Sequence, residues 1–219
     1  MTVRGTAGEL FGTARGQTLY VLGDGPSLPA KPPDDWQRGR CIGTNRIYLT
    51  AHRPRIVMVQ DRDVLHQQIT NYLSCADILV LGPELTNSRS PETTRLFGCP
   101  RIRALSFQKQ RVAPGSWARG GPQAFAREGY LTGYYAADLA CRMVWPEGRV
   151  VLAGMDLEWP TDPRAPTHAY GYGAEHGASA TRFPEAVDAM VRLWDAVRGK
   201  IDIRVHGHSA LLARGIPPV

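Results

Sequence analysis

The sequence predicts an α/β fold: a mostly parallel sheet of about seven strands, flanked by helices. Short apolar, β-branched runs recur along the chain, and two later segments repeat their apolar residues at helical spacing. Continuous apolar runs such as Ile56–Val59 and Ile78–Leu81 are typical of strands that helices cover on both faces. The expected strands are Thr18–Leu22, Arg40–Thr44, Arg55–Val59, Asp77–Leu81, Arg101–Leu105, Arg149–Ala153 and Ile201–Val205.

Two helices are predicted from their apolar stripes. In Tyr134–Trp145 the stripe includes Leu139 and Met143, and a similar stripe runs through Pro184–Arg198. Pro184 suits the first turn of the second helix, and Gly199 suits the position after its end.

Two long segments lack periodicity, Ser106–Leu131 and Leu157–Phe183. Long irregular loops within a domain are often functional, so the second is interpreted as a C-terminal lid over a ligand. The alternative is a mobile surface loop with unremarkable histidines. The sequence shows no repeat and no low-complexity linker, so we expect one domain over residues 1–219. The lid side chains that could act on a ligand are Trp159, His168, Tyr170, Tyr172 and His176.

The composition is that of a soluble globular protein, with 219 residues of which 43% are hydrophobic and 21% charged. No run of 18 apolar residues and no signal-peptide pattern occur, so we expect no membrane span and a cytoplasmic location. The cysteines are irregularly spaced, which predicts reduced and mostly buried thiols. They are Cys41, Cys75, Cys99 and Cys141.

The formal net charge of +6 favours an anionic partner, such as a nucleotide, a nucleic acid or an acidic glycan. Arginines scattered over a solvated surface would give the same charge without a partner.

The first predicted strand ends in the turn Gly23-Asp24-Gly25-Pro26-Ser27, which we interpret as a nucleotide-binding turn. Glycine lets backbone N–H groups approach a ligand, and Ser27 offers a hydroxyl donor. In open α/β sheets ligands bind at this end of the strands. On this interpretation a side chain at Gly25 would obstruct a phosphate with little loss of fold. Many Gly/Pro turns bind nothing, so a structural turn remains the alternative.

Four segments in order resemble a known group of enzymes. They are Leu22-Gly-Asp-Gly-Pro-Ser-Leu28, Ile42-Gly-Thr-Asn-Arg-Ile-Tyr48, Thr132-Gly-Tyr-Tyr-Ala-Ala-Asp-Leu-Ala140 and Val150-Val-Leu-Ala-Gly-Met-Asp-Leu157. The group comprises bacterial lipooligosaccharide sialyltransferases, Maf-type flagellin glycosyltransferases and archaeal 6-hydroxymethylpterin diphosphokinases. The resemblance implies a Rossmann-like nucleotide-binding core.

Carried to this sequence, the resemblance implies that Gly23, Gly25, Pro26 and Ser27 line the phosphates. It further implies that the nucleotide is bound by Asn45, Thr132, Gly133 and Asp156. Asp24 departs from the asparagine usual in the family and would repel a phosphate unless a cation or a sugar hydroxyl intervened.

Asp61 and Asp63 follow the third strand and form an Asp-x-Asp pair that could hold Mg²⁺ or Mn²⁺ against a diphosphate. Equally, Asp63 could cap a helix that begins near Val64.

The sequence therefore predicts a glycosyltransferase that moves a sugar from a nucleotide-sugar donor to a hydroxyl of a glycan or a modified nucleic acid. His168 or His176 would remove the acceptor proton, with Tyr170 or Tyr172 stabilising the leaving phosphate. The first alternative is a pyrophosphoryl transferase that uses ATP and Mg²⁺. The second is a basic nucleic-acid-binding domain without catalysis.

Overall fold

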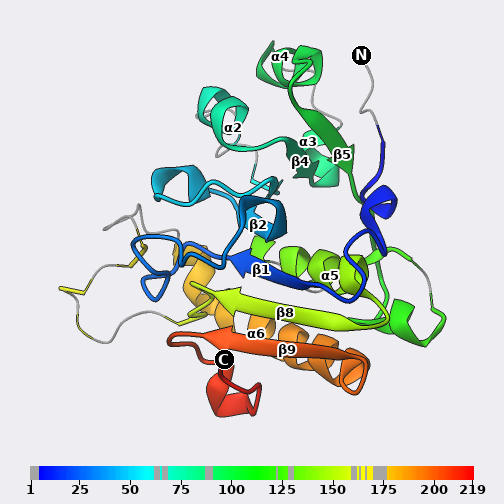
Figure 1. The fold of residues 1–219 in the computed structure, drawn as a ribbon, viewed down its shortest axis with the longest axis vertical. Helices are drawn as coiled ribbons and strands as arrows, with labels where there is room; N and C mark the ends of the chain where they lie inside the picture. Colours follow the sequence, from blue (N-terminus) through cyan, green and yellow to red (C-terminus); the bar gives the residue numbers. More distant parts are fainter. Residues whose placement is uncertain are drawn as a thin grey trace.

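A seven-stranded parallel sheet forms the centre of the protein (Figure 1). The structure is a computed structural model and describes residues 5–61, 65, 69–86, 91–121, 123–127, 131–158, 162, 164–165, 167–169 and 177–219. The strand order is β5-β4-β3-β2-β1-β8-β9, and all neighbouring strands are parallel. The strands are β1 (Thr18–Leu22), β2 (Cys41–Thr44), β3 (Ile56–Val59), β4 (Ile78–Leu81), β5 (Arg103–Ser106), β8 (Gly148–Ala153) and β9 (Ile201–His206). These are the seven predicted strands, with ends shifted by two residues at most, so the predicted Rossmann-like α/β fold is confirmed.

Helices cover both faces of the sheet. On one face, α5 (Thr132–Val144) and α6 (Gly177–Val197) pack over β1, β8 and β9, and Figure 1 shows them together behind these strands. Residues of α2 (Ile69–Cys75), α3 (Pro83–Thr86) and α4 (Pro91–Gly98) belong to the core cluster of the other face. Successive side chains of a strand point to opposite faces, so Val21 belongs to the first core and Leu22 to the second.

The strand order reverses beside β1. From β1 the chain adds β2 to β5 on one side of β1, and it then returns through α5 to place β8 on the other side. In open parallel sheets such a reversal leaves a crevice at the carboxyl ends of the two strands, where ligands bind. The ends of β1 and β8 are therefore the first place to look for a site.

The two predicted helices are present, but the second begins earlier than expected. α5 starts at Thr132, two residues before the predicted start, whereas α6 starts at Gly177 and contains Pro184 within it. A proline removes only the hydrogen bond of its own nitrogen, so helix can form on both sides of it. The irregular segment predicted to reach Phe183 therefore ends before Gly177, and residues 159–161, 163, 166 and 170–176 lie outside the described residues.

The segment predicted to be irregular between Ser106 and Leu131 contains regular structure. β6 (Lys109–Gln110) pairs in parallel with β7 (Phe125–Ala126), and a 3₁₀ turn at Ser116–Arg119 lies between them. Phe107, Trp117 and Phe125 are buried in the core. Elements this short give no periodic signal, which explains the difference.

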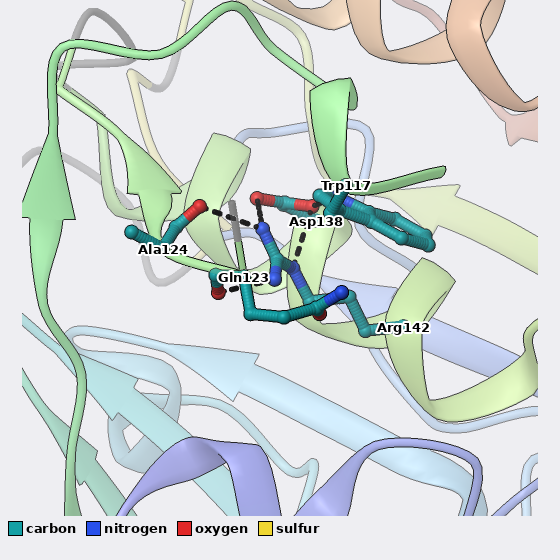
Figure 2. A network of polar contacts seen from close by, with 5 residues as sticks. All are labelled: Trp117, Gln123, Ala124, Asp138 and Arg142. Atoms are coloured by element: carbon teal, nitrogen blue, oxygen red, sulfur yellow. Dashed lines mark hydrogen bonds and ion pairs between the residues drawn. The ribbon is translucent and has the colours of Figure 1, made fainter. Parts of the chain in front are cut away.

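A buried ion pair attaches this segment to α5 (Figure 2). The Arg142 and Asp138 side chains are each only 1% exposed, and Arg142 Nε donates to Asp138 Oδ1 at 3.1 Å. Arg142 also donates to the carbonyls of Gln123 at 2.7 Å and Ala124 at 3.0 Å. Trp117 Nε1 donates to Asp138 Oδ1 at 2.6 Å, so both charges are compensated inside the core.

All four cysteines are free thiols, and all but the half-buried Cys99 are buried, as predicted. Within the described ranges no helix is long and apolar enough to span a membrane.

Candidate functional site

The turn after β1 packs directly on the turn after β8. Gly23 N–H donates to Ala153 C=O at 2.8 Å, and Gly25 N–H donates to Gly154 C=O at 2.9 Å. The Ser27 N–H then donates to Asp156 Oδ2 at 3.1 Å. The predicted phosphate-binding turn and the predicted nucleotide-binding residue Asp156 are thus parts of one structural unit at the strand reversal.

The glycines of this turn are required by its packing. A Cβ at Gly23 would lie 2.2 Å from the Gly154 carbonyl oxygen, and a Cβ at Gly25 would lie 2.0 Å from Asp156 Oδ2. Gly133 is required for the same steric reason, because a Cβ there would lie 2.6 Å from Met155 Cε. The sequence interpretation attributed the first two glycines to ligand approach, whereas the structure gives all three a steric role that holds with or without a ligand.

We therefore expect Gly25→Ala to lower the free energy of unfolding by about 1–3 kcal/mol, the usual cost of overpacking. This differs from the expectation that Gly25 tolerates a side chain with little loss of fold. Gly39→Ala is the matched control, because no atom lies within 4 Å of the added Cβ. Chemical denaturation of both variants measures the effect, and equal stabilities would show that the two turns move apart freely.

Asp156 is a buried carboxyl group at the end of β8. It is 5% exposed, and this removal from water raises the pKa of its carboxyl, while hydrogen bonding from Ser27 acts in the opposite direction. Within the described part of the chain, Asp156 Oδ1 and Ser27 Oγ are buried without a hydrogen-bond partner. Buried polar atoms are normally paired, so these two atoms mark a place where a polar ligand group or a water molecule fits.

Asn45 connects the ends of β2 and β3 to the start of α5. Its Nδ2 donates to Asp61 Oδ2 at 3.1 Å, and its Oδ1 accepts from Thr132 Oγ1 at 3.0 Å. The backbone φ of Asn45 is +40°, in the left-handed region that asparagine tolerates better than most residues. The Tyr72 hydroxyl donates to the Asn45 carbonyl at 2.7 Å and braces this conformation. Asn45 and Thr132, both predicted to bind the nucleotide, therefore contact each other.

Asp24 lies beside His168, which belongs to the segment predicted to form a lid. The Ala169 N–H donates to the Asp24 carbonyl at 2.9 Å, which places the neighbouring His168 beside the turn. Removal from water raises the pKa of the Asp24 carboxyl, and the His168 imidazole and the Arg46 guanidinium lower it again. Thr167 Oγ1 lies 3.0 Å from His168 Nδ1. Asp24 thus provides a carboxylate next to His168, the predicted base.

The proposed metal pair is only partly described. Asp61 is exposed and accepts a hydrogen bond from Asn45. Its negative charge contributes to the raised pKa of Asp24. Asp63 lies outside the described residues. In the ranges that are described, no three His, Cys, Asp or Glu side chains group as metal ligands. The predicted lid residues Tyr170, Tyr172 and His176 also lie outside the described residues.

The sequence interpretation did not include Gln60 and Arg46. Gln60 follows β3 directly and its Nε2 donates to Thr132 Oγ1 at 3.3 Å, and Arg46 follows Asn45. Gln60 directly follows a predicted strand, and Arg46 lies two residues after the end of another. Residues in such positions lie at the carboxyl edge of the sheet, and this is the signal that could have identified them.

Comparisons with protein-family models, with curated proteins and with solved structures give no match to this chain. The interpretation of the site therefore depends on its geometry.

Proposed function

We propose that this protein is a glycosyltransferase that binds a nucleotide-sugar donor at the carboxyl edge of the sheet and transfers the sugar to a hydroxyl acceptor. The observation that carries the proposal is the convergence of polar side chains at the strand reversal. Five separate segments contribute to it, and the residues are Asp24, Asn45, Asp61, Thr132 and Asp156. Such an edge is where nucleotides bind in folds of this class.

The chemistry assigned to His168 follows from its place beside Asp24. The acceptor oxygen attacks the anomeric carbon of the sugar, and the bond from that carbon to the phosphate oxygen breaks. The nucleotide leaves with the electron pair, and the imidazole of His168 takes the acceptor proton. The Asp24 carboxylate favours the resulting imidazolium, because the two opposite charges attract each other.

A pyrophosphoryl transferase is the second candidate, and the proximity of Asp61 to Asp24 favours it. Two neighbouring carboxylates could hold Mg²⁺ on the phosphates of ATP. In this reaction an acceptor oxygen attacks the β-phosphorus of ATP and AMP leaves. The two candidates therefore differ in the bond that breaks and in their need for a divalent cation.

A thermal-shift screen tests both candidates. We expect at least one of CMP, UDP, GDP, ATP or their sugar conjugates to raise the melting temperature. At a concentration of about 100 Kd a ligand adds about 2.7 kcal/mol. For a chain of this size that corresponds to roughly 5–10 °C. A shift by sugar nucleotides that persists in EDTA supports the glycosyltransferase, whereas a shift by ATP that requires Mg²⁺ supports the second candidate.

Asn45→Gly should weaken binding of the nucleotide found in this screen by about tenfold, the effect of losing one or two ligand hydrogen bonds. Glycine is chosen because it adopts the positive φ of Asn45 without strain. Gln37→Ala, an exposed position just before β2, is the control. Isothermal titration calorimetry gives both affinities. Unchanged binding by Asn45→Gly would place the nucleotide elsewhere.

A further inference from the structure

Polar contacts at the carboxyl edge continue past the candidate site toward β5. Gln60, which bonds Thr132, also lies against Gly82 at the end of β4, with its Cγ 3.5 Å from the position of a Gly82 Cβ. The Glu84 Oε2 atom lies 3.1 Å from the same point. Because Gly82 has no side chain, the Gln60 and Glu84 side chains can both lie over it. The edge therefore carries polar groups from β1 to β4.

Lys109 follows β5 in the chain and contacts Glu84, the last of these polar residues. Its ammonium is 3.5 Å from Glu84 Oε1, 5.1 Å from the centroid of the Tyr135 ring and 5.9 Å from that of Phe107. The Lys109 side chain is only 18% exposed, whereas Glu84 is 61% exposed. A long contact to an exposed carboxylate neutralises an ammonium only weakly. The two rings therefore fix the position of a positive charge that has a weak counter-ion.

The buried ion pair of Figure 2 explains how Lys109 is positioned. Lys109 pairs with Phe125 in the two-stranded sheet of β6 and β7. Arg142 binds the carbonyls of the two residues immediately before Phe125, and it extends from α5, the helix that begins with Thr132. One helix thus holds both the Thr132 hydroxyl and the segment that carries Lys109. Such support from buried contacts is what holds a binding group in a defined place.

We propose that Lys109 binds a phosphate group of the substrate at the β4–β5 end of the carboxyl edge, and that Glu84 is the counter-ion which this phosphate displaces. The proposal rests on the proposed function, because it takes the substrate to lie along this edge. An ammonium is a compact charge with three donors, well suited to phosphate oxygens. The ammonium already lies near the rings of Tyr135 and Phe107, so little side-chain freedom is lost on binding.

Titration calorimetry with inorganic pyrophosphate at low ionic strength tests the subsite. Wild-type protein should bind it, and Lys109→Met, which retains a long apolar stem, should bind it at least about tenfold more weakly. Arg111→Met is the matched control, because Arg111 is exposed and lies two residues further along. Glu84→Gln should bind pyrophosphate more tightly than wild type, since the competing carboxylate is gone. Circular dichroism melting curves confirm that each variant is folded.

Three results would overturn the subsite: no pyrophosphate binding by the wild type, equal binding by Lys109→Met, or an equal loss in Arg111→Met. Weaker binding by Glu84→Gln would contradict the role given to Glu84. Pyrophosphate contains no nucleoside, so these results are independent of the nucleotide screen with Asn45→Gly. If Lys109→Met weakens pyrophosphate and the screened nucleotide alike, the phosphate belongs to the donor. If only pyrophosphate is affected, it belongs to the acceptor.

Discussion

Replacing Arg142 by methionine should lower the free energy of unfolding by about 3–5 kcal/mol, the cost of removing one partner of a buried ion pair. Asp138 would keep a charge that is 1% exposed, and among the described side chains the Trp117 indole would remain as its donor, at 2.6 Å. The carbonyls of Gln123 and Ala124 would also lose their donor. For a chain of this size the melting temperature should fall by about 10 °C.

Arg15→Met is the matched control for this prediction. Arg15 pairs with Glu147 at 3.1 Å, but the two side chains are 62% and 65% exposed. An exposed pair contributes no more than about 1 kcal/mol, so the control should melt near the wild type. Denaturant titrations of both variants give the comparison. If Arg142→Met were as stable as Arg15→Met, the arginine would not be buried and paired as described.

A double variant, Asp138→Asn with Arg142→Met, separates the ion pair from the other contacts of Arg142. Asparagine keeps an acceptor for Trp117 without the charge. The double variant should therefore be more stable than the sum of the two single effects predicts, because the second change removes the charge that the first leaves unpaired.

The fold could be predicted because its strands carry a local signal. Runs such as Ile56–Val59 and Ile78–Leu81 are buried on both faces, and a run of this kind has few alternatives to a central strand. The missed elements, β6 and β7, are two residues long and depend on Arg142, far along the chain. An Asp–Arg pair four residues apart on a helix usually lies at the surface, so no local pattern indicates that this one is buried.

The sequence indicates which residues belong to the site, but not which of them form hydrogen bonds with each other. Parallel strands bring their carboxyl ends to one edge, so residues that follow strands, such as Asn45 and Asp156, could be assigned to it. Which of them touch depends on the register and on loop geometry. The sequence groups Asp61 with its neighbour Asp63, which lies outside the described residues. It does not reveal that Asp61 also bonds Asn45, which in turn bonds Thr132 from a distant helix.

His168→Ala should lower kcat by about 10²- to 10⁴-fold while the donor still binds, because a positioned base contributes that much to the chemical step. The described contacts favour His168 for this role, since Ala169 ties it to Asp24. His206→Ala is the control, because that ring packs edge-on against Trp36, 5.2 Å away between centroids. The measurement is kcat with the donor found in the screen, alongside its dissociation constant.

Asp24→Asn tests whether the carboxylate acts through the imidazole. In the wild type the rate should rise with pH on the acidic side, since His168 must lose its proton before it can accept one. Burial raises the pKa of Asp24, and the attraction between its carboxylate and the imidazole opposes that rise. The same attraction favours the protonated imidazole. Without that charge the imidazole releases its proton more readily, so the acidic limb of the rate profile should move to lower pH and the maximal kcat should fall. A lower kcat with an unmoved limb would make Asp24 a purely structural residue. Full activity of His168→Ala would exclude His168 as the base and turn the search to Asp24 and Asp156.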